Sequence, residues 1–336
     1  MNGINAAGLH GAMPNVWRNA VLEAAPDFAD MTTGESLPGM EAYGPVFLTH
    51  LASVAEMEGD GEREIHLRTT DLRHRREEAA GALAVAHKDR THEQRGLVRR
   101  VAVGLTNLGS AQRKAGQRDA RNTLEEAAAL AREIGDWRLE ALNRLNLGVY
   151  WMVVSFPAEF ARADAEFAIG YDLAIADDPP LAGDLMTERG TVFYERGMAT
   201  TDRAVAETYF QQAATHLELA VGLREPNAVL CHQFGQVHRQ LGNFDYARAW
   251  FEQGIELREN ELTPGAGADA RLHLAQTLDE ANLVAEALSY ALSAEAVLAR
   301  VDEPDPTLQF EVEQTIARLA LRAGAMPHVA SPTFPH

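Results

Sequence analysis

The residues best suited to chemistry in this sequence are its twelve histidines, since an imidazole can bind a metal ion or transfer a proton. The densest group is His232, Gln236 and His238, with His273 further along the chain. None of them stands in an HExxH sequence or another spacing typical of a zinc or iron site. We therefore predict no metal site and no cofactor, and we interpret His238 as a packed, hydrogen-bonded histidine.

Other candidate catalytic groups are equally isolated. His66, Asp71 and His74 share roughly one face of an expected helix, which we interpret as solvated surface. The single cysteine, Cys231, permits no intramolecular disulfide, and its place inside an expected helix predicts a core residue. The sequence also lacks a phosphate-binding loop, a dinucleotide-binding motif and a GxSxG nucleophile motif. Enzymatic activity stays uncertain on these grounds, and we expect none.

The composition favours closely packed helices. Apolar residues make up 46% of the chain but aromatic residues only 7%, so the core must consist mainly of Ala, Leu and Val. No apolar run is long enough to span a membrane and the first residues do not resemble a secretory signal, so we expect a cytoplasmic protein without membrane contact. A net charge of −19 argues against nucleic acid as a partner. Residues 62–121 are basic, however, and can either bind an acidic partner or pair within the molecule.

A recurring dipeptide divides the chain into repeats. Its copies are Leu108-Gly109, Leu147-Gly148, Arg189-Gly190, Phe234-Gly235 and Leu274-Ala275. The frame is clearest in residues 228–257, where the dipeptide falls in one expected helix and Gly242 can take the positive φ that ends it. A second helix follows, with Ala247, Phe251 and Gly254 on one face. Small residues at such positions let the two helices of a hairpin approach closely.

This pattern resembles that of the tetratricopeptide repeat (TPR) family. Residues 228–257 and 268–297 are similar to its consensus, and residues 124–148 resemble the longer variety of roughly 40 residues. That variety is known from bacterial regulators, peptide receptors and kinesin light chains. The resemblance implies an all-α, TPR-type α-solenoid, which is a right-handed superhelix of antiparallel helix hairpins. We expect about five to six repeats and a C-terminal capping helix.

The expected organisation has three parts. Residues 1–40 form an irregular segment with a short helix, residues 41–323 the repeat domain and residues 324–336 a flexible tail. The repeats are predicted at 44–88 (degenerate), 91–135, 137–176, 181–223, 226–259 and 266–299, with the cap at 306–323. Thr91 and Gln94 predict a capping box at the start of one helix. The cap should have a polar outer face, because the end of a stacked array meets solvent.

The resemblance places the first helix of each hairpin along a concave groove. One groove position reads Asn107 and Asn146 in successive repeats, and a side-chain amide can both donate to and accept from an extended peptide backbone. Alternatively, these positions are polar only because they are solvated. The remaining groove candidates are Ser110, Arg113, Glu188, Thr191, Tyr194, His232, Gln233, Gln236, Arg239, His273 and Gln276.

Three functions remain open at this point. The first is a non-enzymatic scaffold or regulatory adaptor of bacterial type, which binds a protein or peptide segment in the groove and can form a homodimer. The second is a receptor for a short signalling peptide that acts through a partner protein. The third is an enzyme or metal-binding protein on a helical-repeat scaffold. The aromatic stretch 150–156 either fills a gap between hairpins or forms a pocket in the groove.

Overall fold

The structure is a computed structural model that describes residues 13–24, 26, 44–259, 267–301 and 304–324. Within these ranges the chain consists of helices with turns and short connecting segments, and no strand occurs. The helices are α1 (Met13–Ala24), α2 (Gly44–Met57), α3 (Gly61–Leu83), α4 (His92–Lys114), α5 (Ala120–Ile134), α6 (Trp137–Val153), α7 (Phe160–Ala174), α8 (Pro179–Met198), α9 (Arg203–Leu223), α10 (Ala228–Gln240), α11 (Phe244–Glu259), α12 (Ala268–Glu280), α13 (Val284–Leu298) and α14 (Pro306–Arg322). Most of the segment 1–40 and the tail beyond Gly324 lie outside the described residues.

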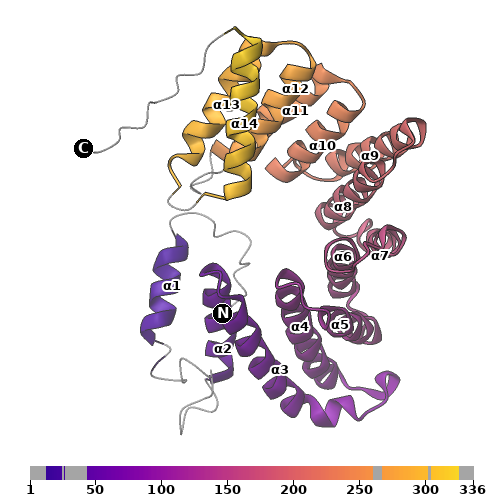
Figure 1. Cartoon of the computed structure of the whole chain (residues 1–336). Helices are drawn as coiled ribbons and strands as arrows, with labels where there is room; N and C mark the ends of the chain where they lie inside the picture. Colours follow the sequence, from indigo (N-terminus) through magenta and orange to yellow (C-terminus); the bar gives the residue numbers. More distant parts are fainter. Residues whose placement is uncertain (1–12, 25, 27–43, 260–266, 302–303, 325–336) are drawn as a thin grey trace. The chain divides into compact units, whose positions relative to one another are not determined.

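The chain forms two compact units, residues 1–192 and residues 193–336, with the boundary inside α8. In each unit, consecutive helices pack as antiparallel hairpins, such as α4 with α5, α6 with α7, α10 with α11 and α12 with α13 (Figure 1). The first helices also contact one another, α4 against α6 in unit 1 and α10 against α12 in unit 2. We call the surface of such a row of first helices the first-helix face. The expected single repeat domain 41–323 stays a prediction.

Small residues allow the helices of each hairpin to touch. A Cβ atom added to Gly148 would lie 2.3 Å from the ring of Phe167 in α7, and one added to Gly235 would lie 2.7 Å from the ring of Phe251 in α11. Both rings are fully buried. These glycines therefore set the distance between the two helices, as the recurring dipeptide predicts.

Local signals at the helix ends behave as the sequence indicates. Thr91 and Gln94 form a complete capping box at the start of α4, with N···O distances of 3.2 and 2.9 Å. Gly242 ends α10 with a φ of +74°, a conformation that favours glycine. The hairpin turns are thus encoded locally, before any packing between hairpins.

The end of unit 2 is closed by α14, which packs against α12 and α13 in the place of a further first helix. Most of its exposed side chains are polar, namely Thr307, Gln309, Glu311, Glu313, Gln314, Arg318 and Arg322, but two large apolar ones lie among them. Phe310 is 61% exposed and Leu321 is 70% exposed. The outer face is therefore largely polar, as expected for the end of a stacked array, and it is interrupted by these two apolar side chains.

Candidate functional site

All thirteen predicted groove residues lie on first helices, and each of them is partly exposed. In unit 1, α4 carries Asn107, Ser110 and Arg113, α6 carries Asn146, and α8 carries Glu188 and Thr191. In unit 2, the end of α8 carries Tyr194, α10 carries His232, Gln233, Gln236 and Arg239, and α12 carries His273 and Gln276. Partial exposure is what a contact surface requires, since its side chains must be both held in place and accessible.

Arg113 connects three helices of the unit 1 face. Its Nε donates to Oδ1 of Asn146 at 3.3 Å, and its charge interacts with the carboxylate of Glu188. Burial raises the pKa of Glu188, while Arg113 acts in the opposite direction. Burial also lowers the pKa of Arg113, against the effect of Glu188. The structure thus brings these three predicted residues together in one polar cluster.

The two predicted asparagines differ in their hydrogen bonds. Asn146 accepts from Arg113 and donates from Nδ2 to the carbonyl oxygen of Leu142 at 3.0 Å. Among the described residues, Asn107 has no side-chain hydrogen bond, and neither has Ser110 one turn later. The amide of Asn107 therefore offers two donors and an acceptor to a ligand.

A third asparagine, Asn143, was not predicted to matter. It is fully buried on α6 and donates from Nδ2 to Oγ1 of Thr106 in α4 at 2.9 Å and to the carbonyl oxygen of Leu139. Its role is to fasten one hairpin to the next. In the sequence, Asn143 stands one helical turn before Asn146. This spacing places both asparagines on one helix but does not show that Asn143 lies on its buried side.

In unit 2, the amide of Gln236 lies between two imidazoles. Its Nε2 is 3.0 Å from Nε2 of His232 and 3.4 Å from Nε2 of His273, and the two rings meet edge to face at 4.9 Å. Burial lowers the pKa of both histidines. For His273 the pKa falls to about 4, because burial acts together with the neighbouring His232 and Arg239. Both imidazoles are therefore neutral at pH 7.

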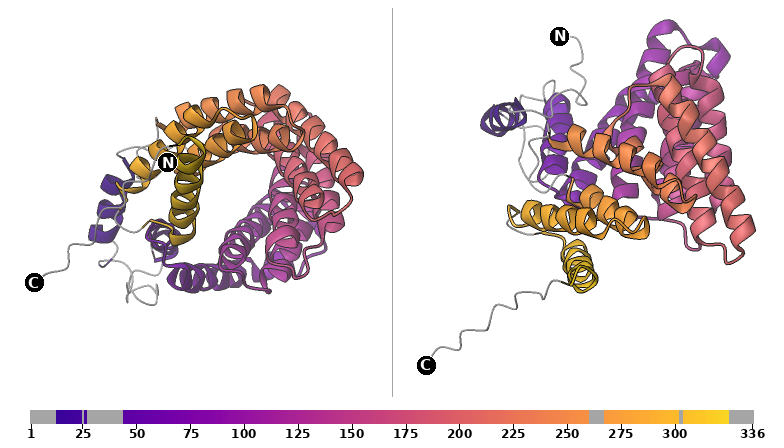
Figure 2. Two further views of the ribbon diagram at one scale, coloured as in Figure 1. Left: turned by 45° about the horizontal axis from the view of Figure 1, so that its top comes forward. Right: turned by 90° about the horizontal axis from the view of Figure 1, so that it is seen from above.

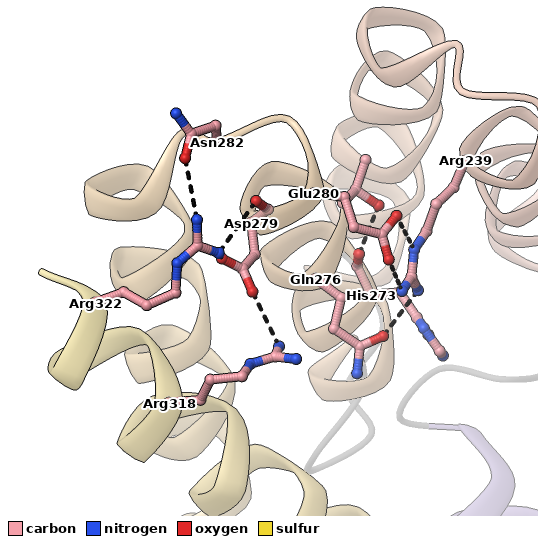
Figure 3. Close-up of polar contacts among 9 residues, drawn as sticks. Arg239, His273, Gln276, Asp279, Glu280, Asn282, Arg318 and Arg322 are labelled. Atoms are coloured by element: carbon pink, nitrogen blue, oxygen red, sulfur yellow. Dashed lines mark hydrogen bonds and ion pairs between the residues drawn. The ribbon is translucent and has the colours of Figure 1, made fainter.

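Arg239 joins the same face to the end of α12 (Figure 3). Its guanidinium donates to Oε1 of Gln276 at 2.8 Å and to both carboxylate oxygens of Glu280 at 3.0 and 2.5 Å. Arg239 also acts on the pKa of Tyr194, which burial raises and Arg239 lowers. Side chains at groove positions thus bind the next hairpin and are also partly exposed. The same residues therefore form the polar face and hold neighbouring hairpins together.

In α8 a glycine outside the recurring dipeptide also makes a close contact with the second helix. In α8 it is Gly197 that faces the partner helix, since an added Cβ would lie 2.5 Å from the ring of Phe210 in α9. The sequence frame had used Gly190, seven residues earlier. Seven residues are close to two helical turns, so Glu188 and Thr191 keep their face.

Comparison with known proteins rests on structure. No model of a protein family matches the sequence, and no curated protein matches it significantly. A Signal Transduction ATPase with Numerous Domains that has a tetratricopeptide repeat sensor, from Pyrococcus horikoshii, superposes over 93% of this chain with a TM-score of 0.60 and 13% identity. This chain has the tetratricopeptide-repeat fold. It spans 42% of the length of that archaeal protein.

Two further TPR structures are more distant. A TPR protein of Thermus thermophilus covers 64% of this chain and 98% of its own length, with 20% identity and a TM-score of 0.46. A TPR protein of Parabacteroides merdae covers 85% and 94%, with 14% identity and a TM-score of 0.43. These two similarities are too weak to establish the fold. The all-α TPR fold predicted from the repeats is nevertheless confirmed by the helices and by the archaeal match.

His238 and the cysteine are part of the packing of this TPR fold. His238 stacks on Tyr246 at 5.4 Å and contacts Phe234 at 4.9 Å, in agreement with its interpretation as a packed residue. Burial raises the pKa of Cys231 to about 11. Within the described ranges no three His, Cys, Asp or Glu side chains are grouped as metal ligands, and no helix there is long and apolar enough to cross a membrane.

The basic region of the TPR array is largely neutralised within unit 1. Its arginines form ion pairs within one helix, such as Arg75–Asp71 at 2.8 Å, and between helices, such as Arg76–Glu126 at 2.6 Å and Arg99–Asp136 at 2.7 Å. Lys114 pairs with Glu56. These contacts favour intramolecular packing over an acidic partner.

The aromatic stretch 150–156 contains both buried and exposed rings. Tyr150 and Trp151 are each 6% exposed and meet edge to face at 5.2 Å, and the guanidinium of Arg162 lies 4.8 Å from the Trp151 ring. Phe156 is 96% exposed. The first two rings therefore fill space between helices of this TPR repeat, and Phe156 forms no pocket with them.

Proposed function

We propose that this TPR protein is a non-enzymatic scaffold or adaptor, and that the first-helix face of unit 1 binds an extended peptide segment of a partner protein. The observation that carries the proposal is the state of Asn107. Its amide is partly exposed and unbonded among the described residues, next to the cluster of Arg113, Asn146 and Glu188. An extended peptide presents alternating C=O and N–H groups that such an amide can bind.

The neighbouring cluster gives the proposal its geometry. The bond between Arg113 and Asn146 fixes the end of α4 relative to α6, so Asn107 and Ser110 stand on a rigid surface. A rigid, pre-formed set of donors and acceptors costs less ordering entropy on binding than a mobile one. In this proposal the peptide contacts the free amide of Asn107 and also meets the mixed charge of Arg113 and Glu188.

Peptides selected from a random displayed library on the purified chain provide the test. We expect Asn107→Ala to weaken their affinity about five- to thirty-fold, the effect of losing one or two hydrogen bonds to a ligand. The matched control is Asn122→Ala, which removes an exposed asparagine from α5, the second helix of the same hairpin. Equal affinities for the wild type and Asn107→Ala would remove the unit 1 face from the proposal.

A second candidate is a sensor for a short peptide that signals through a partner. It is favoured by the superposition on a signalling ATPase described as having a TPR sensor, of which this chain spans 42%. A sensor must change conformation on binding, whereas a scaffold need not. A change in small-angle scattering dimensions on saturation with a selected peptide supports the sensor, and unchanged dimensions support the scaffold.

A further inference from the structure

The outer face of α14 exposes two large apolar side chains, Phe310 and Leu321. Helix α14 closes the row of helices in unit 2, where it follows α12 and α13 (Figure 2). Val312, Thr315 and Leu319 are buried on its inner side, against the preceding hairpin. On the opposite side, at helical spacing, lie Phe310, Ala317 and Leu321, all exposed. Gln314 lies between them, so the outer stripe carries two large exposed apolar side chains, Phe310 and Leu321, on a helix whose opposite side is already buried.

The inner side of α14 is firmly held, so the exposed stripe is presented in a fixed orientation. Asp279 on α12 is 8% exposed, and both Arg318 and Arg322 of α14 reach it (Figure 3). Arg322 also donates to Oδ1 of Asn282 at 3.0 Å. The contacts clamp the C-terminal half of α14 onto the end of α12. The stripe is therefore a rigid surface and not the result of a loose helix.

We infer that this face binds a second copy of the chain through an antiparallel α14–α14 contact. When two identical helices pair in antiparallel fashion about a two-fold axis, the same edge of one helix meets that edge of the other. The two edges then run in opposite directions. Glu311 and Arg318 lie seven residues apart on one such edge, and both are exposed. In the pair, Glu311 of each copy faces Arg318 of the other, and Phe310 faces Leu321.

The charges on this edge fit a second copy. Glu311 has no ion pair among the described residues, so a partner can supply one. Arg318 lies 3.3 Å from Asp279 but keeps 54% of its side chain exposed, which leaves donors free. One pair of helices buries less than the roughly 1,600 Å² of a standard interface, so the dimer should form at micromolar concentration and not at nanomolar.

Sedimentation velocity over a concentration series provides the test. We expect the wild type to move from the 36.7 kDa of one chain to twice that mass as the concentration rises. Leu321→Glu should weaken the dimer at least ten-fold, and so should Glu311→Lys, which sets like charges opposite each other. Tyr246→Glu is the control, because Tyr246 is 66% exposed on α11, away from this stripe. Circular dichroism would verify that each variant remains helical.

Cross-linking then tests the antiparallel register. Cys231 is fully buried, so a cysteine introduced by Gln314→Cys near the two-fold axis is the accessible thiol. Oxidation should give a disulfide-linked dimer in this variant and none in Tyr246→Cys. A chain that stays monomeric at every concentration would overturn the inference, including the case in which residues 325–336 cover the face. So would a dimer that Leu321→Glu leaves unchanged.

Discussion

Individual side chains on the first helices serve two purposes, and the histidine pair of unit 2 shows this clearly. His232 and His273 meet across two hairpins with Gln236 between them, and the same three residues occupy positions that face a ligand in the TPR pattern. Their neutrality is essential to the contact, because two charged imidazoles at this distance would repel each other. The stability of unit 2 should therefore depend on pH.

The first prediction concerns this dependence. The pKa of His273 is about 4 in the folded chain and 6.5 in the unfolded chain, so between these values the unfolded chain binds the proton more tightly. Burial is the largest cause of this decrease in the pKa of His273. His232 and Arg239 lower the pKa further, whereas Asp269 and Gln276 raise it. The free energy of unfolding should fall as the pH decreases from 6.5 to 4. Each pKa unit corresponds to about 1.4 kcal/mol, so the loss is at most about 3 kcal/mol, reduced by the partial exposure of the ring.

Denaturant titrations across this pH range are the measurement. The variant His273→Gln removes the titrating ring and should flatten the slope between pH 6.5 and 4. His87→Gln replaces an exposed histidine outside the cluster and should leave the slope unchanged. An unaltered slope in His273→Gln would show that this ring is not responsible.

Sequence reasoning predicted which face of each first helix is polar but not the partners of its side chains. The sequence predicts the helix face on which residues such as Asn107 and Asn146 lie, because that face follows from helical periodicity. Which of them bonds to the next hairpin depends on distances between helices, which no local pattern contains. Arg113 illustrates this, since its bond to Asn146 joins residues from two repeats.

At the scale of the element, the hairpin depends on a glycine facing a ring. The Leu-Gly dipeptides predicted these contacts because only a residue without a Cβ allows such an approach. In α8 the close contact with the ring of Phe210 is made by Gly197, which lies outside the recurring dipeptide. The sequence of α8 contains several small residues and did not reveal which of them faces Phe210 in α9.

The second prediction tests the glycine contact. Gly148→Ala places a methyl group 2.3 Å from the Phe167 ring, which is fully buried and cannot move aside, so we expect a loss of about 1–3 kcal/mol in the free energy of unfolding. Gly96→Ala is the matched control in α4. No atom lies within 4 Å of its added methyl group, and the higher helix propensity of alanine should stabilise the chain by up to about 1 kcal/mol. Equal effects of both changes would contradict the close approach.

The third prediction concerns the attachment of α14. Asp279→Asn removes the charge that Arg318 and Arg322 share, and a buried carboxylate with two such partners contributes more than a surface pair. Since both arginines are about half exposed, we expect the free energy of local opening of α14 to fall by about 1–3 kcal/mol. Hydrogen exchange of the α14 amides should accelerate accordingly. Glu280→Gln, which affects Arg239 of α10 instead, should leave α14 exchange unchanged.

At the scale of the whole molecule, the two units each combine a row of hairpins with an exposed polar first-helix face. The repeat fold was predictable from the spacing of small residues over most of the chain. The exposure of Phe310 and Leu321 on α14 was not, because the run 310–323 reads as a simple amphipathic helix until its buried side is known.

The central claim is that a peptide lies against the first helices of unit 1. Photo-cross-linking tests it most directly, with a photoreactive amino acid replacing Ser110 on α4 or, as the control, Ala129 on the exposed side of α5. With a library-selected peptide bound at saturation, we predict a covalent product from position 110 and none from position 129. Cross-linking from position 129 alone would place the ligand on the second helices and contradict the claim.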